Sequence, residues 1–453
     1  MKRMAVYSAV LASAIMLTAC GTGSTTATSS SAASAASTGT ASSVSTAAGT
    51  SDSDTIVVTW WGNQTRNDLT QQVLDKYSSE NNVTFDGQFS DWANYWSKTA
   101  TSSAGQTLPD ILQMDYAYLA QYAETGQLAD LTPYVDDGTI DVSDVSESIL
   151  ASGEVDGKLY AIPLGINAPT LVYNKTLLDE NGISIKDNMS MEEFYSICQQ
   201  VYEKTGYKTD VFYGNGNSYI EYVMRDQGAV LFEEGKLGAT AEQLQKYFDI
   251  YEKGISEGWM CSPEIYAERS LGSVEQMPLV YGSSPDTRSW CAFSWSNSVT
   301  AFSDTVNGEF ELGITNWPAD NEQAADYLKP SMFFCISATS THADEAAAFL
   351  NYWTNDIEAN QILLAERGVP ISSKVSDAIS DSLDEINQSV ISYINDNVSN
   401  NCSAINPPAP EGSSEVTDLI NSLTEQVCYQ SITAEEAADQ LYTQGNSIMA
   451  SKS

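Results

Sequence analysis

The feature that most constrains the fold is a strand followed at once by a helix. Residues 55–61 (TIVVTWW) form a near-continuous apolar run, which is typical of a strand buried on both faces of a sheet. Gly62 ends this run, and Leu69, Val73 and Tyr77 then recur at four-residue spacing, which predicts an amphipathic helix. A strand followed by a helix begins a βαβ unit, so we expect an α/β fold with helices flanking mostly parallel sheets.

The same alternation continues along the chain. Two helix starts match the capping box, Ser190-x-x-Glu193 and Thr433-x-x-Glu436. The 399 residues from 55 to 453 are long for one core, so we expect at least two domains. Further strands are predicted in short apolar runs at 110–114, 171–173, 291–295, 310–314 and 332–336.

The N-terminal segment predicts export and lipid attachment. Lys2-Arg3 and a short apolar stretch precede Leu17-Thr18-Ala19-Cys20, which resembles the lipobox of bacterial lipoproteins. We therefore expect residues 1–19 to be a signal peptide and Cys20 to carry the lipid. Residues 21–54 are almost entirely Ser, Thr, Ala and Gly, so residues 20–54 should form the lipidated Cys and a disordered linker. The expected location is the extracellular face of the cell membrane, in a Gram-positive-type cell more than in a periplasm.

Charge and cysteine usage exclude several classes of partner. Without Lys2 and Arg3 the chain has 18 Lys+Arg against 60 Asp+Glu, a formal net charge of −42, which argues against nucleic acid and acidic membrane surfaces. Six cysteines remain after Cys20, and the sequence leaves open whether any pair as disulfides. There is one His and no CxxC, so we expect no metal site and no cofactor.

The sequence offers no strong catalytic motif. It contains no GxSxG, P-loop or GxGxxG. Dispersed carboxylates could still meet in space as glycosidases require, so a surface glycoside hydrolase stays open as an alternative. A binder of peptides or another non-sugar solute is the second alternative.

Polar and aromatic residues follow several predicted strands at their carboxyl ends, where ligands of open α/β sheets bind. This mixture suits a neutral polyhydroxylated ligand, because aromatic faces cover C–H surfaces while Asp, Asn and Arg hydrogen-bond to hydroxyls. Any single aromatic could equally be a core residue. The residues concerned are Trp61, Asn63, Gln64, Arg66, Asp115, Tyr116, Trp295, Asn297 and Trp317.

Several segments, in order, resemble the extracellular solute-binding proteins of sugar ABC transporters, the family that contains maltose-binding protein. The more specific pair is DGKLYAIP (156–163) and LVYNK (171–175). The supporting segments are the strand–helix start at 56–80, PDILQMD at 109–115, YAETG at 122–126, WSN at 295–297, ISATS at 336–340 and GVPIS at 368–372.

The resemblance implies a hinged, two-lobed fold of the periplasmic-binding-protein type II class, with discontinuous lobes. One lobe would comprise residues 55–163 plus 331–370, and the other 164–330 plus 371–453. The hinges would lie near Pro163–Asn167, Lys329–Ser331 and Gly368–Pro370.

The resemblance also implies a site between the lobes and a function. The chain has Asn167 where a hinge carboxylate is implied, which argues against maltose itself. We expect a monomeric, non-enzymatic sugar-binding subunit that delivers its ligand to ABC permease subunits and meets the membrane only through its lipid. The site residues carried over are Asn63, Gln64, Arg66, Asp115, Tyr116, Asn167, Tyr219, Trp295, Asn297 and Glu411.

Overall fold

The structure is a computed structural model that describes residues 55–211, 213–214, 216–267, 269 and 273–452. The predicted signal peptide, Cys20 and linker lie outside the described residues, so those predictions stay as stated. Across the described ranges, no helix combines the length and the apolar character needed to cross a bilayer.

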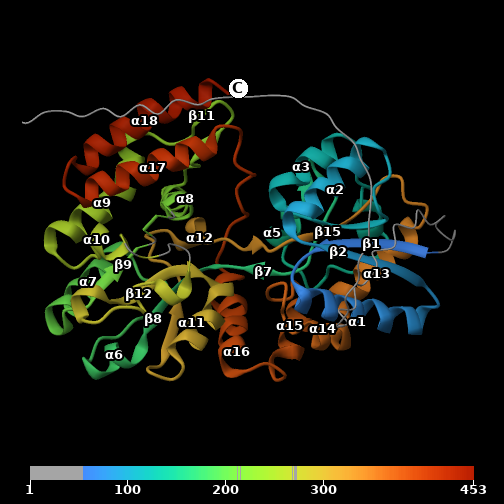
Figure 1. The fold of residues 1–453 in the computed structure, drawn as a ribbon, viewed down its shortest axis with the longest axis horizontal. Coiled ribbons are helices and arrows are strands. Elements are labelled where there is room, and N and C mark those ends of the chain that lie inside the picture. The colour runs from blue at the N-terminus through green and yellow to red at the C-terminus, as the bar shows by residue number, and fades with distance from the viewer. Residues whose placement is uncertain (1–54, 212, 215, 268, 270–272, 453) are drawn as a thin grey trace, which may run out of the picture. The chain divides into compact units, whose positions relative to one another are not determined.

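The first sheet has five strands in the order β2-β1-β3-β15-β6, of which β1, β2 and β15 are labelled in Figure 1. Side chains alternate between the two faces along each strand, and both faces are buried at the central strands β3 and β15. In β15, Phe334 and Ile336 belong to one apolar cluster, while Phe333 and Cys335 belong to another. The strands are β1 (Thr55–Trp61), β2 (Thr84–Ser90), β3 (Ile111–Met114), β6 (Ile162–Pro163) and β15 (Phe333–Ile336).

The second sheet has four strands in the order β13-β8-β12-β9. Its strands and the helices packed on it share a core rich in Tyr, Phe and Trp, in which Trp259, Trp290 and Phe293 are fully buried. The helices α17 (Ser413–Cys428) and α18 (Ala434–Ala450) lie beside α9 (Ala241–Glu257) and extend this core (Figure 1). The strands are β8 (Pro169–Asn174), β9 (Lys208–Asp210), β12 (Ser289–Trp295) and β13 (Leu312–Thr315).

All of the predicted strands are confirmed, but the expectation of mostly parallel sheets is wrong. Parallel pairing holds for β1 with β2 and with β3, and for β12 with β9. The helices after β1 and β2 return the chain to the same edge, which gives the βαβ geometry. By contrast, β15 is antiparallel to β3 and β6, and β8 is antiparallel to β12 and β13. The chain does not connect β15 or β8 to these antiparallel partners through a single crossover helix. The βαβ pattern therefore did not predict their direction.

The three predicted hinge segments lie side by side. In β7 (Ile166–Asn167), Asn167 pairs with Lys329 of the antiparallel β14 (Lys329–Pro330). On the other side, the Ile166 N–H donates to the Val369 carbonyl at 2.9 Å, and the Val369 N–H donates back at 3.1 Å. The close contact requires Gly165, since a Cβ there would lie 2.2 Å from the Arg367 carbonyl oxygen. The division into hinged lobes remains a prediction.

The remaining elements cover the sheets. Both predicted capping boxes are confirmed, at Ser190 and at Thr433. The longer helices are α1 (Gln64–Asn81), α2 (Trp92–Ala104), α3 (Tyr116–Glu124), α7 (Met191–Thr205), α8 (Gly216–Asp226), α11 (Val299–Val306), α13 (Ala343–Asn355), α14 (Ile357–Leu363), α15 (Ser373–Ser380) and α16 (Glu385–Ser392). The shorter helices are α4 (Thr132–Asp136), α5 (Glu147–Leu150), α6 (Lys175–Glu180), α10 (Pro263–Tyr266), α12 (Glu322–Ala325), η1 (Ala151–Gly153), η2 (Val274–Gln276), η3 (Pro285–Thr287), η4 (Ser296–Ser298) and the π-helix η5 (Tyr393–Val398). The short strand pairs are β4 (Glu154–Val155) with β5 (Lys158–Leu159), and β10 (Phe232–Glu233) with β11 (Lys236–Leu237).

The described cysteines are free thiols, and most of them are buried. Cys291 and Cys335 lie within buried strands, and burial raises the pKa of both thiols. They act as small apolar core residues.

Candidate functional site

The carboxyl end of β1 carries a cluster of aromatic rings. Trp61, the last residue of β1, packs its ring against Trp92 at 5.0 Å and Trp96 at 5.7 Å, and Tyr118 packs against Trp96 at 4.2 Å. Trp61 is 8% exposed, whereas Trp92 is 46% and Tyr118 is 36% exposed. These four residues are called here the aromatic patch, and within it Trp92 and Tyr118 present ring surface to solvent where β1 and β3 end.

The polar residues predicted beside this patch hold local structure. Asn63 is the N-cap of α1, and its side-chain oxygen accepts from the Arg66 N–H at 2.9 Å. Asp115 caps α3 in the same way, accepting from the Ala117 N–H at 2.9 Å. The Arg66 guanidinium pairs with Glu366 at 2.9 Å and is mostly buried. Gln64 is exposed, and its amide donates to Asp68 at 2.6 Å.

Tyr116 connects α3 with the distant segment around residue 406. Its hydroxyl donates to the Asn406 carbonyl at 2.9 Å, and its ring lies 6.2 Å from that of Phe333. Burial, with a contribution from Glu221, raises the pKa of Tyr116 to about 12. The hydroxyl therefore stays protonated and serves as a neutral hydrogen-bonding group.

Asn406 is held in place by two charged residues of α8. Arg225 donates to the Asn406 side-chain oxygen at 2.7 Å, and the Asn406 amide donates to Glu221 at 3.0 Å. Arg225 also donates to the Ser403 hydroxyl at 2.7 Å and to the Ala404 carbonyl at 2.9 Å. Burial raises the pKa of Glu221, while the Arg225 charge opposes this shift. A buried, preorganised network fixes segment 403–406 against α8.

Trp295 lies at the end of β12, next to the predicted hinge. Its ring is half-buried and packs against Tyr327 at 5.9 Å, and the Lys329 ammonium lies 5.0 Å from the ring centroid. Lys329 pairs with Asn167 across β14 and β7, so Trp295, Lys329 and Asn167 are neighbours. Tyr327 links this group to Asn406, because the Arg225 guanidinium lies 4.6 Å from the Tyr327 ring.

The structure thus connects residues from both sheets and from the crossing strands through one chain of contacts. We define the candidate site as Tyr116, Asn167, Glu221, Trp295, Lys329 and Asn406. Three of its members, Tyr116, Asn167 and Trp295, were predicted from the sequence. The site combines an aromatic face with amide, hydroxyl and charged groups, which suits a polar, ring-shaped solute.

Four predicted residues lie neither in the candidate site nor at or beside the aromatic patch. Tyr219 and Trp317 are fully buried and pack against each other at 5.8 Å within the core of the second sheet. Their rings are covered by protein in this structure, so we leave them out of the candidate site. Asn297 is exposed in η4, and Glu411 is exposed after the Pro-rich segment 407–410.

The sequence reasoning missed several residues that the structure brings to these sites. For the aromatic patch a signal existed, because Trp92 and Trp96 are four residues apart and so share one face of a helix. For Glu221 and Arg225 the spacing is the same, but an acid and a base four residues apart usually form a solvated surface pair. Lys329 and Asn406 had no local signal.

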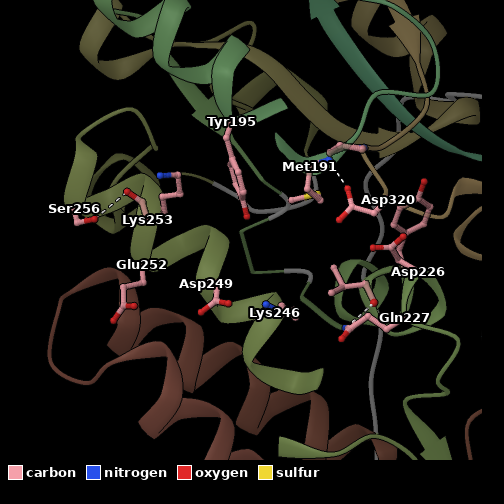
Figure 2. Close-up of a pocket in the computed structure, with 13 residues that line it drawn as sticks. Met191, Tyr195, Asp226, Gln227, Lys246, Asp249, Glu252, Lys253, Ser256 and Asp320 are labelled. Atoms are coloured by element: carbon pink, nitrogen blue, oxygen red, sulfur yellow. Dashed lines mark hydrogen bonds between the residues drawn. The ribbon is translucent and has the colours of Figure 1, made fainter. Parts of the chain in front are cut away.

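A separate cavity of about 600 Å³ lies among α7, α8 and α9 (Figure 2). Figure 2 shows the Tyr195 side chain pointing into this cavity, with Lys253, Asp249 and Asp320 around it. None of the predicted site residues lines this cavity, and within the described part of the chain no three His, Cys, Asp or Glu side chains are grouped to hold a metal ion.

Comparison with known proteins assigns the family. Residues 72–388 match the model of the bacterial extracellular solute-binding proteins, and the chain belongs to this family. An extracellular solute-binding protein of family 1 from Alicyclobacillus acidocaldarius has a similar structure, with a TM-score of 0.79 and 24% identity over 87% of this chain and 98% of that one. The predicted fold class, that of the periplasmic solute-binding proteins, is confirmed.

Two curated relatives are similar over part of the chain. The diacetylchitobiose-binding protein DasA of Streptomyces coelicolor is 28% identical over 40% of this chain and 45% of its own length. An arabinooligosaccharide-binding protein of Halalkalibacterium halodurans is 27% identical over 27% of this chain and 30% of its own length. The matched segments span less than half of each relative. The predicted resemblance to extracellular solute-binding proteins is confirmed.

Proposed function

We propose that this chain is the carbohydrate-binding subunit of an ABC importer. The observation that carries the proposal is the candidate site, where the half-buried Trp295 ring lies beside Asn167 and Lys329, and Tyr116 reaches Asn406. A pyranose ring can lay its C–H face on an aromatic ring while its hydroxyls hydrogen-bond to amide, hydroxyl and charged groups. The names of both curated relatives, a diacetylchitobiose binder and an arabinooligosaccharide binder, support a sugar as the solute.

In this proposal the protein captures its ligand by hinge closure and does no covalent chemistry. Two lobes, residues 55–163 plus 331–370 and residues 164–330 plus 371–453, rotate about the paired segments at 163–167, 329–331 and 368–370. Contacts from both lobes favour the closed form, which the permease subunits recognise, and the ligand shifts the equilibrium by its differential affinity. The aromatic patch extends the sugar-binding surface beyond the candidate site. The chain acts as a monomer held to the outer face of the membrane through Cys20.

A thermal-shift screen against mono- and oligosaccharides, with peptides of similar mass as controls, tests the proposal. A sugar present at 100 times its dissociation constant should stabilise the fold by about 2.7 kcal/mol. Stabilisation by peptides and not by sugars would contradict it.

Incubation with the same glycosides should release no free sugar, and release would favour a hydrolase. Cys20→Ala should release the protein from the membrane or leave it unprocessed, and a variant that stays membrane-bound and is correctly cleaved would contradict the lipid anchor.

A further inference from the structure

A cavity of about 400 Å³ adjoins the candidate site. Glu221 and Asn406 belong to both, since they line the cavity and also form the hydrogen-bonded pair that holds Tyr116. The other walls are the β10 region and the segment 407–410 (PPAP). A ligand that rests on the candidate site can therefore extend into this cavity without leaving the surface that Tyr116 and Asn406 define.

The cavity has an apolar wall and a one-sided charge. Phe232 and the proline rings of 407–410 offer flat C–H and aromatic surfaces, on which a sugar ring can stack. The charged groups of the lining are the carboxylates of Glu221, Glu233 and Glu234, and no Lys or Arg belongs to the described lining. Glu233 is paired with Lys236 at 2.7 Å, and the charges of Arg225 and Lys329 act on Glu221 from outside the lining, while no ion pair among the described residues involves Glu234.

Of Glu221 and Glu234, Glu221 is the deeper carboxylate. It accepts from the neutral amide of Asn406, while Arg225 directs its hydrogen bonds to neutral oxygens of Asn406, Ser403 and Ala404. Burial raises the pKa of Glu221, so its ionised form is poorly solvated. A cation in the cavity would stabilise that ionised form. The formal net charge of −40 would also draw a positively charged solute toward the protein.

We propose that this cavity binds a sugar ring that carries a protonated amino group, so that the preferred ligands are oligosaccharides with free amino sugars. The ring stacks on Phe232 and the proline surfaces, and its ammonium faces the Glu221 carboxylate. This inference rests on the proposed function and names the class of its ligand.

Isothermal titration with a matched series tests the inference. The glucosamine trimer, its tri-N-acetylated form and cellotriose share one β-1,4 backbone and one length, and differ only in the group on C2. The pairs glucosamine with glucose and galactosamine with galactose are added so that other stereochemistry is sampled. At mildly acidic pH and low salt, an amino sugar should bind about 10- to 100-fold more tightly than its neutral counterpart, the value of a charge-assisted hydrogen bond. Added salt should reduce this ratio.

Three variants connect the preference to the cavity. Glu221→Gln should lower the ratio about tenfold, because the amide cannot pair with the ammonium. Glu234→Gln, an exposed member of the same lining, should lower it less. Glu242→Gln removes one charge from an exposed residue at the start of α9 that does not line the cavity, and should leave the ratio unchanged. Circular dichroism confirms that each variant is folded.

The outcomes separate the inference from the proposed function. A neutral sugar that binds as tightly as its amino counterpart overturns the inference and leaves the proposed function intact. An unchanged ratio in both Glu221→Gln and Glu234→Gln also overturns it. If no sugar of any kind binds, the proposed function fails and the inference fails with it.

Discussion

The ends of β1 and β13 show two kinds of surroundings for a tryptophan at the end of a strand. At the end of β1, Trp61 packs against Trp92 and Trp96, and Trp92 remains 46% exposed. After β13, Trp317 is fully buried, and the Tyr222 hydroxyl of α8 donates to its carbonyl at 2.8 Å. The difference lies in what covers the strand end, because α8 covers Trp317 while the patch near α2 and α3 faces solvent.

This comparison limits the rule that ligands bind at the carboxyl ends of strands. The rule identifies the edge of a sheet at which ligands bind. Where a helix packs over that edge, however, a residue there is buried in the core. Trp295 is the intermediate case, since its half-buried ring packs against Trp317 at 5.9 Å on one side and lies near Lys329 on the other.

The largest expected effect is on stability at Trp317. Trp317→Ala should lower the free energy of unfolding by about 3–5 kcal/mol, the usual cost of removing a fully buried large side chain. Trp92→Ala, at the exposed patch, should lower it by less than about 1 kcal/mol. Urea unfolding followed by circular dichroism measures both. Equal losses in the two variants would remove the distinction between covered and open strand ends.

A second effect concerns Trp295 and its strand neighbour Trp290. Trp295→Ala should weaken sugar binding about 10- to 100-fold, because the aromatic face for the ring is lost. Trp290 is fully buried and donates to the Thr209 hydroxyl at 2.9 Å, so Trp290→Ala should mainly lower the free energy of unfolding. Calorimetry and urea unfolding on both variants separate the roles. Normal affinity in Trp295→Ala would remove β12 from the site.

A smaller expected effect is a pH dependence of the free energy of unfolding. Burial raises the pKa of Asp326 from 3.8 to about 7 and that of Glu322 from 4.5 to about 8, and the nearby Asp326 charge adds to the shift of Glu322. The folded state therefore binds protons more tightly than the unfolded state between the unfolded and the folded pKa values. The free energy of unfolding should fall as pH rises from about 4 to about 8. Urea unfolding at about pH 5 and about pH 9 measures the change. Glu322→Gln should flatten the profile, and an unchanged slope would exclude this group as a cause.

Much of the fold followed from local pattern. Apolar runs located the strands, and the boxes at Ser190 and Thr433 located two helix starts, because these signals are encoded within a few residues. Strand direction did not follow, since the partners of β15 lie far away in sequence. Of the candidate site, Tyr116 and Trp295 could be found because they lie at or just after the ends of strands. Asn406 could not, because its role comes from Arg225 and Tyr116, which precede it by 181 and 290 residues.

The central claim is that a sugar binds at the candidate site and contacts segments from both sheets. Hydrogen–deuterium exchange followed by mass spectrometry, with and without the best sugar of the screen, tests it most directly. We expect slower exchange in peptides that contain Tyr116, Trp295, Lys329 and Asn406. The contrary result is slower exchange confined to one sheet, or to the peptides around Tyr195 and Asp249 that line the cavity in Figure 2.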